Sequence, residues 1–301
     1  MKVGMSRVVR SMRGAAPHSL SRSAVLCLLI TLCFCVDALL SAPSAAARFK
    51  AGDDWRHVAQ VAGYMSGRSP KRPLVYLLGG SAARECIVSE KSWRAQIVAR
   101  GGPQTLAFGL GAASQTYDDN IRLLRLLPEA PSIVIIGVNV GRYTGKGAHR
   151  LPQVKPRISA YDPHRFRAAH VLSDQWKSAM VTDWLRRRHP VFKARFARND
   201  AKLEELVALC IDRGFHPVLL NLPVNQRVVG RRMDVPRRRY RVACQRICRE
   251  YGIDWVNWLP SIPLVSADFV DNWHLVEPGR VKWQARLSNL TVRLLKQHGM
   301  D

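Results

Sequence analysis

An aspartate and a histidine near the end of the chain, Asp271 and His274, have the types and spacing of an acid–base pair. They lie three residues apart in the segment DNWHL, which Pro278 and Gly279 follow, and the segment is predicted to be a loop. On a loop, a carboxylate at this spacing can hydrogen-bond to the imidazole and orient it toward a nucleophile. Such a pair activates a serine or a cysteine, so a third residue must complete the group.

A serine that could be this nucleophile follows the apolar run LVYLL at residues 74–78. The run is predicted to be a strand buried on both faces, as in a parallel sheet. Gly79 and Gly80 then predict a turn that ends at Ser81. A serine in this position most often caps the following helix, so Ser81 alone indicates no chemistry. Its role depends on whether it meets His274.

Predicted strands and helices alternate along the chain. The expected strands are residues 74–78, 104–110, 132–138, 217–222 and 253–256. The expected helices are residues 53–67, 82–100, 118–127, 199–213, 237–251 and 279–297. Repeated β-α-β units of these lengths predict a three-layer α/β/α fold with a central parallel sheet, in one domain at residues 48–301.

Further polar or glycine positions follow the other expected strands. In an open parallel sheet, binding sites form at the carboxyl ends of the strands. Gly109 and Gly111 lie near the end of the second strand, and Asn139 directly follows the third. The Gly109 and Ser81 backbone N–H groups and the Asn139 amide therefore predict an oxyanion hole.

Each of these residues also has an ordinary structural role. The two glycines could be turn residues or part of a phosphate loop, and Asn139 could be a turn residue. His274 could be an ordinary loop histidine, and Asp271 could cap a helix. Together with Ser81, however, they fill every role in acyl transfer: nucleophile, base, orienting acid and oxyanion donors. We therefore predict Ser81, His274 and Asp271 as catalytic residues.

Four segments resemble the blocks of the SGNH (GDSL-type) hydrolase superfamily, in the same order. They are GGSAAR at 79–84, FGLGA at 108–112, GVNV at 137–140 and DNWH at 271–274. The resemblance covers about residues 74–140 and 250–297. It implies an SGNH-type α/β/α fold and a serine esterase or acyltransferase without a metal or other cofactor.

Two residues depart from the superfamily's pattern. Gly80 stands where an aspartate usually precedes the serine, and Val140 stands where an aspartate usually follows the asparagine. Both changes occur in diverged members, among them an envelope acyltransferase branch similar to the D-alanyl-transfer proteins of teichoic acid assembly. That branch implies an N-terminal membrane anchor and a membrane acyl-transfer partner. The missing acids also keep open a non-catalytic binding or assembly protein that docks on an anionic or membrane partner.

The first 47 residues have the order of a secretory signal: basic residues, an apolar run and then small residues, with Ala45 and Ala47 suited to cleavage. Extended to residue 40, the apolar run approaches the length of a membrane span, so an uncleaved anchor is the alternative. Both interpretations predict that residues 48–301 are extracytoplasmic.

The chain of 301 residues is strongly basic, with 47 Lys and Arg against 22 Asp and Glu and a net charge of +25. The leader holds five of the basic residues and one acid, Asp37, so most of this charge belongs to the folded part. This balance predicts an anionic partner: an acylated envelope glycan or lipid, or the envelope surface. Nucleic acid ranks below these because no recognition motif is visible.

Residues 142–199 interrupt the alternation of strands and helices. This segment is rich in Arg, His and Pro and contains the run Arg186–Arg188. We expect an insertion of loops and short helices that forms a lid, a docking surface or a solvated face.

The cysteines have no metal-ligand spacing, so a structural zinc is not expected. Cys244 and Cys248 share a predicted helix face, where disulfide geometry is seldom reached. Any disulfide would therefore pair one of them with Cys86 or Cys210.

Overall fold

The computed structural model of this protein describes residues 53–158 and 170–300. These residues fall in one compact unit, Lys50–Asp301. The predicted leader at residues 1–47 lies outside the described residues. Within the described part of the chain, no helix is long and apolar enough to cross a membrane.

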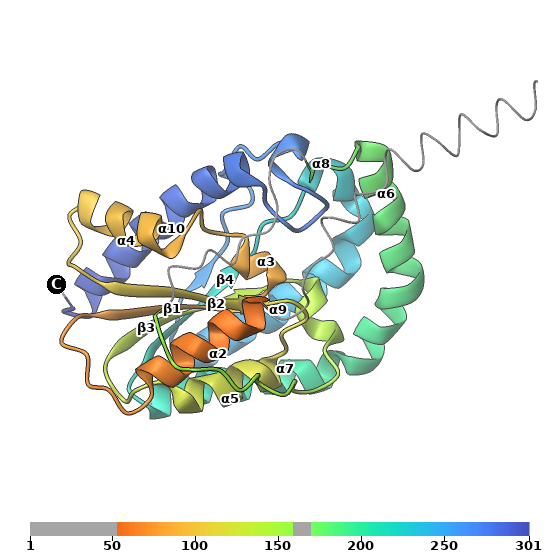
Figure 1. Cartoon of the computed structure of the whole chain (residues 1–301). Coiled ribbons are helices and arrows are strands. Elements are labelled where there is room, and N and C mark those ends of the chain that lie inside the picture. The colour runs from red at the N-terminus through yellow and green to blue at the C-terminus, as the bar shows by residue number, and fades with distance from the viewer. Residues whose placement is uncertain (1–52, 159–169, 301) are drawn as a thin grey trace, which may run out of the picture. The chain divides into compact units, whose positions relative to one another are not determined.

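Five parallel strands form the central sheet, in the order β2-β1-β3-β4-β5 (Figure 1). They are β1 (Leu74–Gly80), β2 (Leu106–Ala112), β3 (Ser132–Val138), β4 (His216–Asn221) and β5 (Trp255–Val256). Every residue of β1 and β3 is buried, which explains why these segments are continuous apolar runs. The predicted three-layer α/β/α fold with a central parallel sheet is confirmed.

Each strand supplies both faces of the sheet, because successive side chains point to opposite sides. On β1, Tyr76 and Leu78 belong to one buried cluster, while Val75 and Leu77 belong to the other. The first face is covered by α2 (Asp53–Met65), α5 (Tyr117–Leu126), α7 (His189–Asp212) and α9 (Asp234–Tyr251). The second face is covered by α4 (Glu90–Ala99) and α10 (Glu277–Gln297).

The strand order reverses beside β1, where the chain passes first to β2 on one side and then to β3 on the other. Such a switch point opens a crevice outside the carboxyl ends of the strands. The ends of these three strands are therefore where a site is expected from the topology.

Two expected elements differ from the prediction near this crevice. The helix expected at residues 82–100 is divided into α3 (Ser81–Arg84) and α4. Strand β2 continues to Ala112, two residues beyond its expected end, so Gly109 lies inside the strand.

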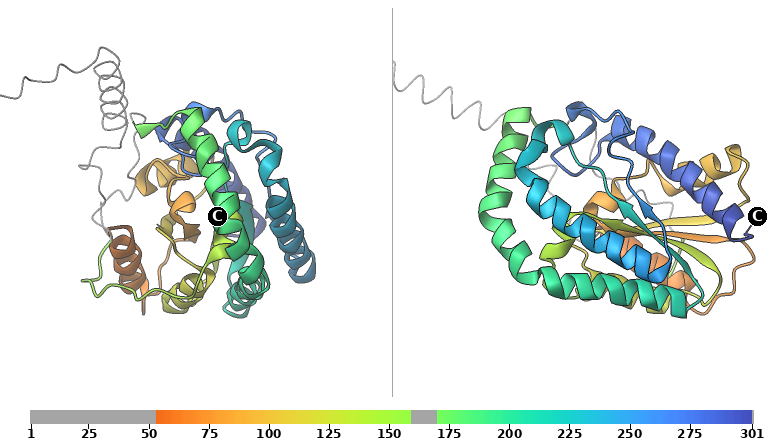
Figure 2. Two further views of the ribbon diagram at one scale, coloured as in Figure 1. Left: turned by 90° about the vertical axis from the view of Figure 1, so that its right-hand side faces the viewer. Right: turned by 180° about the vertical axis from the view of Figure 1, so that it is seen from behind.

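Much of the segment 142–199 is one long helical run instead of loops and short helices. Helix α6 (Asp174–Asp183), the π-helical turn η4 (Trp184–Arg188) and α7 follow one another directly, and Figure 2 shows them as one curved run. A π-helical turn and a proline are the usual causes of such a bend, and Pro190 lies in the first turn of α7. Asn199, expected to cap a helix, instead lies inside α7 and donates to the Tyr143 backbone oxygen at 3.0 Å.

The four cysteines in the described residues, Cys86, Cys210, Cys244 and Cys248, are buried free thiols. None of the disulfides considered from the sequence, between Cys244 or Cys248 and Cys86 or Cys210, is formed among them. Burial raises the pKa of the Cys248 thiol to about 12, so this side chain behaves as a small apolar core residue.

Candidate active site

The loop at residues 271–274 is fixed to the rest of the fold by its buried asparagine. The Asn272 side-chain amide donates to the Lys177 backbone oxygen at 2.7 Å, and its backbone oxygen accepts from the Asn225 N–H at 3.0 Å. On either side of this loop, Phe269 and Leu275 form an antiparallel β-bridge. These contacts hold the loop against α6 and the N-terminus of α8 (Gln226–Val229), which Asn225 caps.

Within this loop, Asp271 orients His274 as the sequence predicted. The Asp271 Oδ2 atom lies 2.7 Å from the His274 Nδ1 atom. The other carboxylate oxygen accepts from the backbone N–H groups of Trp273 at 2.8 Å and His274 at 2.9 Å. Both oxygens are therefore engaged, which fixes the carboxylate and leaves the Nε2 atom of the ring for another partner.

That partner is Ser81. The Ser81 Oγ atom, at the end of β1, lies 2.8 Å from the His274 Nε2 atom. The structure thus brings together three residues from opposite ends of the chain in the arrangement of a nucleophilic triad. The distance lies in the range in which a base can accept the hydroxyl proton.

The electrostatics of the pair favour a protonated histidine. Burial acts to lower the pKa of His274, but the charge and hydrogen bond of Asp271 outweigh it and raise the pKa above its ordinary value. Burial acts to raise the pKa of Asp271, but the charge of His274 and three hydrogen bonds outweigh it and lower the pKa. The carboxylate therefore stays ionised and stabilises an imidazolium next to Ser81.

The structure does not support Gly109 as an oxyanion donor. Its backbone N–H donates to the Glu90 Oε1 atom at 2.9 Å inside the protein. Because β2 continues to Ala112, Gly109 pairs with Leu77, well before the end of the strand. The prediction for Gly109 was wrong because it placed the end of this strand too early.

A different residue after β2, Ser114, is the candidate oxyanion donor on this strand. Ser114 lines the same cavity as Ser81 and Asn139. Its φ of 57° is left-handed, which is uncommon for a residue other than glycine, and among the described residues its backbone N–H donates no hydrogen bond. The sequence carried only a weak signal for it, a small polar residue in the turn after an apolar strand.

Asn139 lies at the end of β3 as expected. Its Oδ1 atom accepts from the Arg142 backbone N–H at 3.2 Å, which orients the side-chain amide. The amide nitrogen donates to none of the described residues, and Asn139 lines the cavity beside Ser81. Asn139 therefore has the position and the free donor that an oxyanion hole needs.

Arg142 connects the turns after β2 and β3. Its guanidinium donates to the Gln115 backbone oxygen and lies over the Tyr117 ring, 4.4 Å from the ring centre. Its own backbone N–H binds Asn139. Arg142 is 4% exposed and burial lowers its pKa, so it acts as an internal brace for Ser114 and Asn139.

These residues surround a cavity of about 410 Å³. Ser81, Ser114, Asn139 and His274 line it, and Trp273 forms part of its wall. Among the described residues, the cavity included, no group of three or more His, Cys, Asp or Glu side chains is arranged to hold a metal ion. The arrangement contains the groups that attack a carbonyl, transfer a proton and bind an oxyanion.

No family model and no curated protein matches the chain. Solved structures do resemble it. A lipase/acylhydrolase from Enterococcus faecalis has 13% identity and a TM-score of 0.42, over 75% of this chain and 96% of that one. A GDSL-like lipase from Bacteroides thetaiotaomicron has 10% identity and a TM-score of 0.42, over 79% and 97%. A catalytic mutant of an acetylxylan esterase from Geobacillus stearothermophilus has 13% identity and a TM-score of 0.43, over 73% and 94%.

These solved structures are described as a lipase/acylhydrolase, a GDSL-like lipase and an acetylxylan esterase, and the four sequence blocks resemble the GDSL-type superfamily. Their TM-scores all lie below 0.5. The functional conclusion rests instead on the distances among Ser81, His274 and Asp271.

Proposed function

We propose that this protein is a serine ester hydrolase or O-acyltransferase that works through an acyl-enzyme. The observation that carries the proposal is the continuous hydrogen-bonded series from Ser81 through His274 to Asp271, at 2.8 and 2.7 Å. A serine that only capped a helix would not need a histidine at this distance, oriented by a carboxylate whose two oxygens are both engaged.

In the first half of the reaction, the Ser81 Oγ atom attacks the ester carbonyl while its proton passes to the His274 Nε2 atom. The carbonyl oxygen becomes an oxyanion, which accepts hydrogen bonds from the Asn139 amide and the backbone N–H groups of Ser114 and Ser81. The tetrahedral intermediate then collapses, the bond to the alcohol oxygen breaks, and His274 returns the proton to that oxygen. The acyl group remains on Ser81.

In the second half, a water or a sugar hydroxyl attacks the acyl-serine and gives its proton to His274. Collapse of the second intermediate returns the proton to Ser81 and releases a carboxylic acid or a new ester. Water makes the protein a hydrolase, and a sugar hydroxyl makes it an acyltransferase. The same residues serve both outcomes.

The proposed location and substrate class rest on features of the sequence. A leader-like segment at residues 1–47 and a basic folded part favour an extracytoplasmic protein, secreted or anchored, that acts on an acylated envelope glycan or lipid. If the protein is an acyltransferase, a membrane acyl-transfer protein would supply the acyl group that Ser81 receives.

The test is hydrolysis of a short aryl ester by the full chain and by Ser81→Ala. Loss of the nucleophile should lower kcat/KM by at least about 10³-fold, while circular dichroism and the unfolding midpoint stay near those of the unaltered protein. A folded Ser81→Ala protein that hydrolyses the ester as fast as the unaltered protein would refute the proposal. Complete inactivity of the unaltered protein on every ester, and on acylated envelope glycans, would favour a binding or assembly protein.

A further inference from the structure

The cavity in front of Ser81 is lined by basic side chains. Lys146 and Arg188 are exposed at its rim, His149 is beside them, and Arg142 forms part of its wall. None of the described lining residues is an aspartate or a glutamate. A cleft lined by charges of one sign and walled by low-dielectric protein concentrates ions of the opposite sign, here anions near the reacting serine.

The two rim cations have no carboxylate partner among the described residues, unlike basic residues close to them. In the same π-helical turn, Arg186 and Arg187 bind Asp183 at 3.1 and 2.8 Å, whereas Arg188 has no ion pair. The Lys202 ammonium lies 2.6 Å from Glu205. Arg188 therefore keeps its charge available for a ligand.

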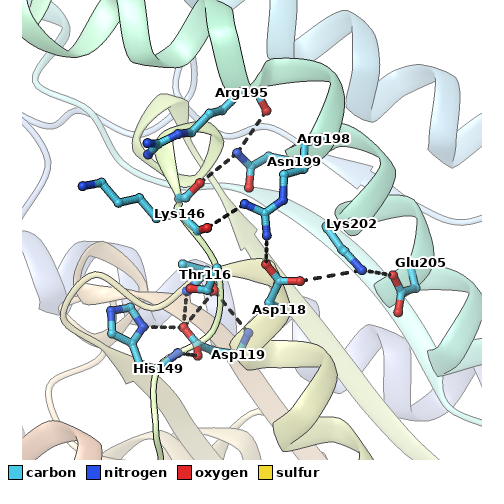
Figure 3. Close-up of polar contacts among 12 residues, drawn as sticks. Thr116, Asp118, Asp119, Lys146, His149, Arg195, Arg198, Asn199, Lys202 and Glu205 are labelled. Atoms are coloured by element: carbon cyan, nitrogen blue, oxygen red, sulfur yellow. Dashed lines mark hydrogen bonds and ion pairs between the residues drawn. The ribbon is translucent and has the colours of Figure 1, made fainter.

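Lys146 is presented in the same way. Its backbone oxygen accepts from the Arg198 guanidinium at 2.6 Å, while Figure 3 shows its side chain extending away from Asp118 with no contact drawn at its ammonium. The nearby Asp118 is already bound by Arg198 at 3.1 Å. Lys146 thus has a fixed backbone and an available charge.

The loop that carries Lys146 is fixed at both ends. Asp119 accepts from the His149 backbone N–H at 2.5 Å and lies 2.8 Å from the His149 Nδ1 atom. Thr116 donates to the Gly147 backbone oxygen at 3.1 Å, and Arg195 donates to the Thr144 backbone oxygen at 3.0 Å. A preorganised loop loses little entropy when it binds a ligand.

The rest of the lining suits a sugar better than a lipid chain. Apart from glycines, the apolar lining consists of Ala82, Trp184 and Trp273, and the remaining described residues are polar. An acyl chain needs a continuous apolar channel, whereas the partly buried Trp273 indole offers a flat surface to a sugar ring, and the hydroxyl and amide groups around it offer partners to the sugar's hydroxyls. Trp184 is only 8% exposed and supports this wall from the core. Trp184 and Arg188 come from the same π-helical turn, which brings both to the cavity.

We propose that this cavity binds an anionic saccharide, with Lys146 and Arg188 holding its carboxylate or phosphate while the sugar's ester lies at Ser81. Arginine and lysine make charge-assisted hydrogen bonds to such groups, arginine with two parallel donors. The identity of the bound ester rests on the proposed function. Recognition of the anion does not, because it requires no turnover.

Binding is measured by titration calorimetry with the full chain carrying Ser81→Ala, which keeps the cavity but removes the nucleophile. The probes are an acetylated trigalacturonate, a phosphorylated trisaccharide and a neutral acetylated maltotriose. At least one anionic probe should bind about tenfold or more tightly than the neutral one, and the difference should shrink as salt is added. The tighter of the two anionic probes identifies carboxylate or phosphate as the recognised group.

Substitutions in the same protein locate the site. Arg188→Gln and Lys146→Gln should each weaken anionic binding about tenfold, because each removes a charged hydrogen bond. The controls Arg187→Gln and Lys202→Gln remove cations that are already paired outside the cavity, so binding should change less than about twofold. Arg188→Lys, which keeps the charge, should recover part of the lost affinity.

Equal binding of anionic and neutral probes would overturn the proposal, as would equal effects of Arg187→Gln and Arg188→Gln. Tighter binding to phosphatidylglycerol vesicles than to any saccharide, through the same two residues, would replace it with a lipid site. Anion-selective binding by a protein that forms no acyl-enzyme would refute the proposed function and leave the anion site standing. Ester hydrolysis without anion selectivity would refute the anion site and leave the proposed function standing.

Discussion

At the scale of single residues, the protonation of His274 determines when Ser81 can react. Serine needs a neutral imidazole to accept its proton, and Asp271 raises the pKa of His274. The histidine therefore loses its proton only above its ordinary pKa of about 6.5. The same carboxylate that delays this loss also stabilises the imidazolium formed during the reaction.

The raised pKa of His274 predicts the pH dependence of kcat/KM. Activity on a short ester should rise with pH and level off above an apparent pKa higher than about 6.5. Asp271→Asn should lower kcat by about 10³–10⁴-fold and move the rise to lower pH, because the charge that raises the histidine's pKa is lost. A pH profile of kcat/KM for both proteins measures this. A rise at the same pH in both would contradict the role of Asp271.

At the scale of elements, Arg142 holds together the two turns that supply oxyanion donors. Its guanidinium fixes the turn after β2 through Gln115, and its backbone N–H fixes Asn139 after β3. The Nε and Nη2 atoms of this buried side chain have no hydrogen-bond partner among the described residues. A buried charge with unpaired donors lowers the stability of the fold. We therefore expect Arg142 to position the oxyanion donors and not to stabilise the fold.

Arg142→Met should therefore separate activity from stability. The free energy of unfolding should change by less than about 1 kcal/mol, because an apolar chain of similar length replaces a costly buried charge. The value of kcat should fall by about tenfold or more with KM changed much less, since a displaced oxyanion donor acts mainly in the transition state. Urea unfolding and steady-state kinetics test both parts. A large loss of stability with unchanged kcat would show that the residue is structural.

At the scale of the whole molecule, a buried ion cluster lies beneath Ser81 and joins α3 to α10. Glu85 is fully buried and binds Arg84 at 2.8 Å and Arg280 at 2.6 Å. Arg84 also binds Asp54 of α2. Removing Glu85 would take away a buried carboxylate that Arg84 and Arg280 share, which is far more costly than breaking an exposed pair.

Glu85→Ala should accordingly lower the free energy of unfolding by about 3–5 kcal/mol. The matched control is Glu204→Ala, which breaks a partly exposed pair with Arg246 and should cost no more than about 1 kcal/mol. Equal losses for the two variants in urea unfolding would show that the cluster is not a support for the fold.

Much of this architecture could be predicted from local sequence. Residues 132–138 form a strand with the expected bounds, since an uninterrupted apolar run between breakers has few alternatives. The position of Ser81 was also predictable, because it directly follows such a run. The pair Asp271 and His274 was predictable from its residue types and spacing. What a sequence cannot supply is the contact between these two ends, which depends on the three-dimensional sheet order.

The errors arose where tertiary contacts override local pattern. Gly109 appeared to end a strand because glycine is a frequent breaker, yet pairing with β1 extends that strand to Ala112. Residues 174–199 appeared irregular because exposed arginines dilute the apolar pattern of a helix that buries only a narrow stripe. Asn199 resembled a helix cap, but its partner is the distant loop at Tyr143.

The most direct test of the central claim is covalent labelling with a fluorophosphonate, followed by peptide mapping in a mass spectrometer. The unaltered protein should gain one phosphonyl group at Ser81, and both Ser81→Ala and His274→Gln should remain unlabelled while folded. Labelling at another serine, or none in the folded unaltered protein under any condition, would contradict the account.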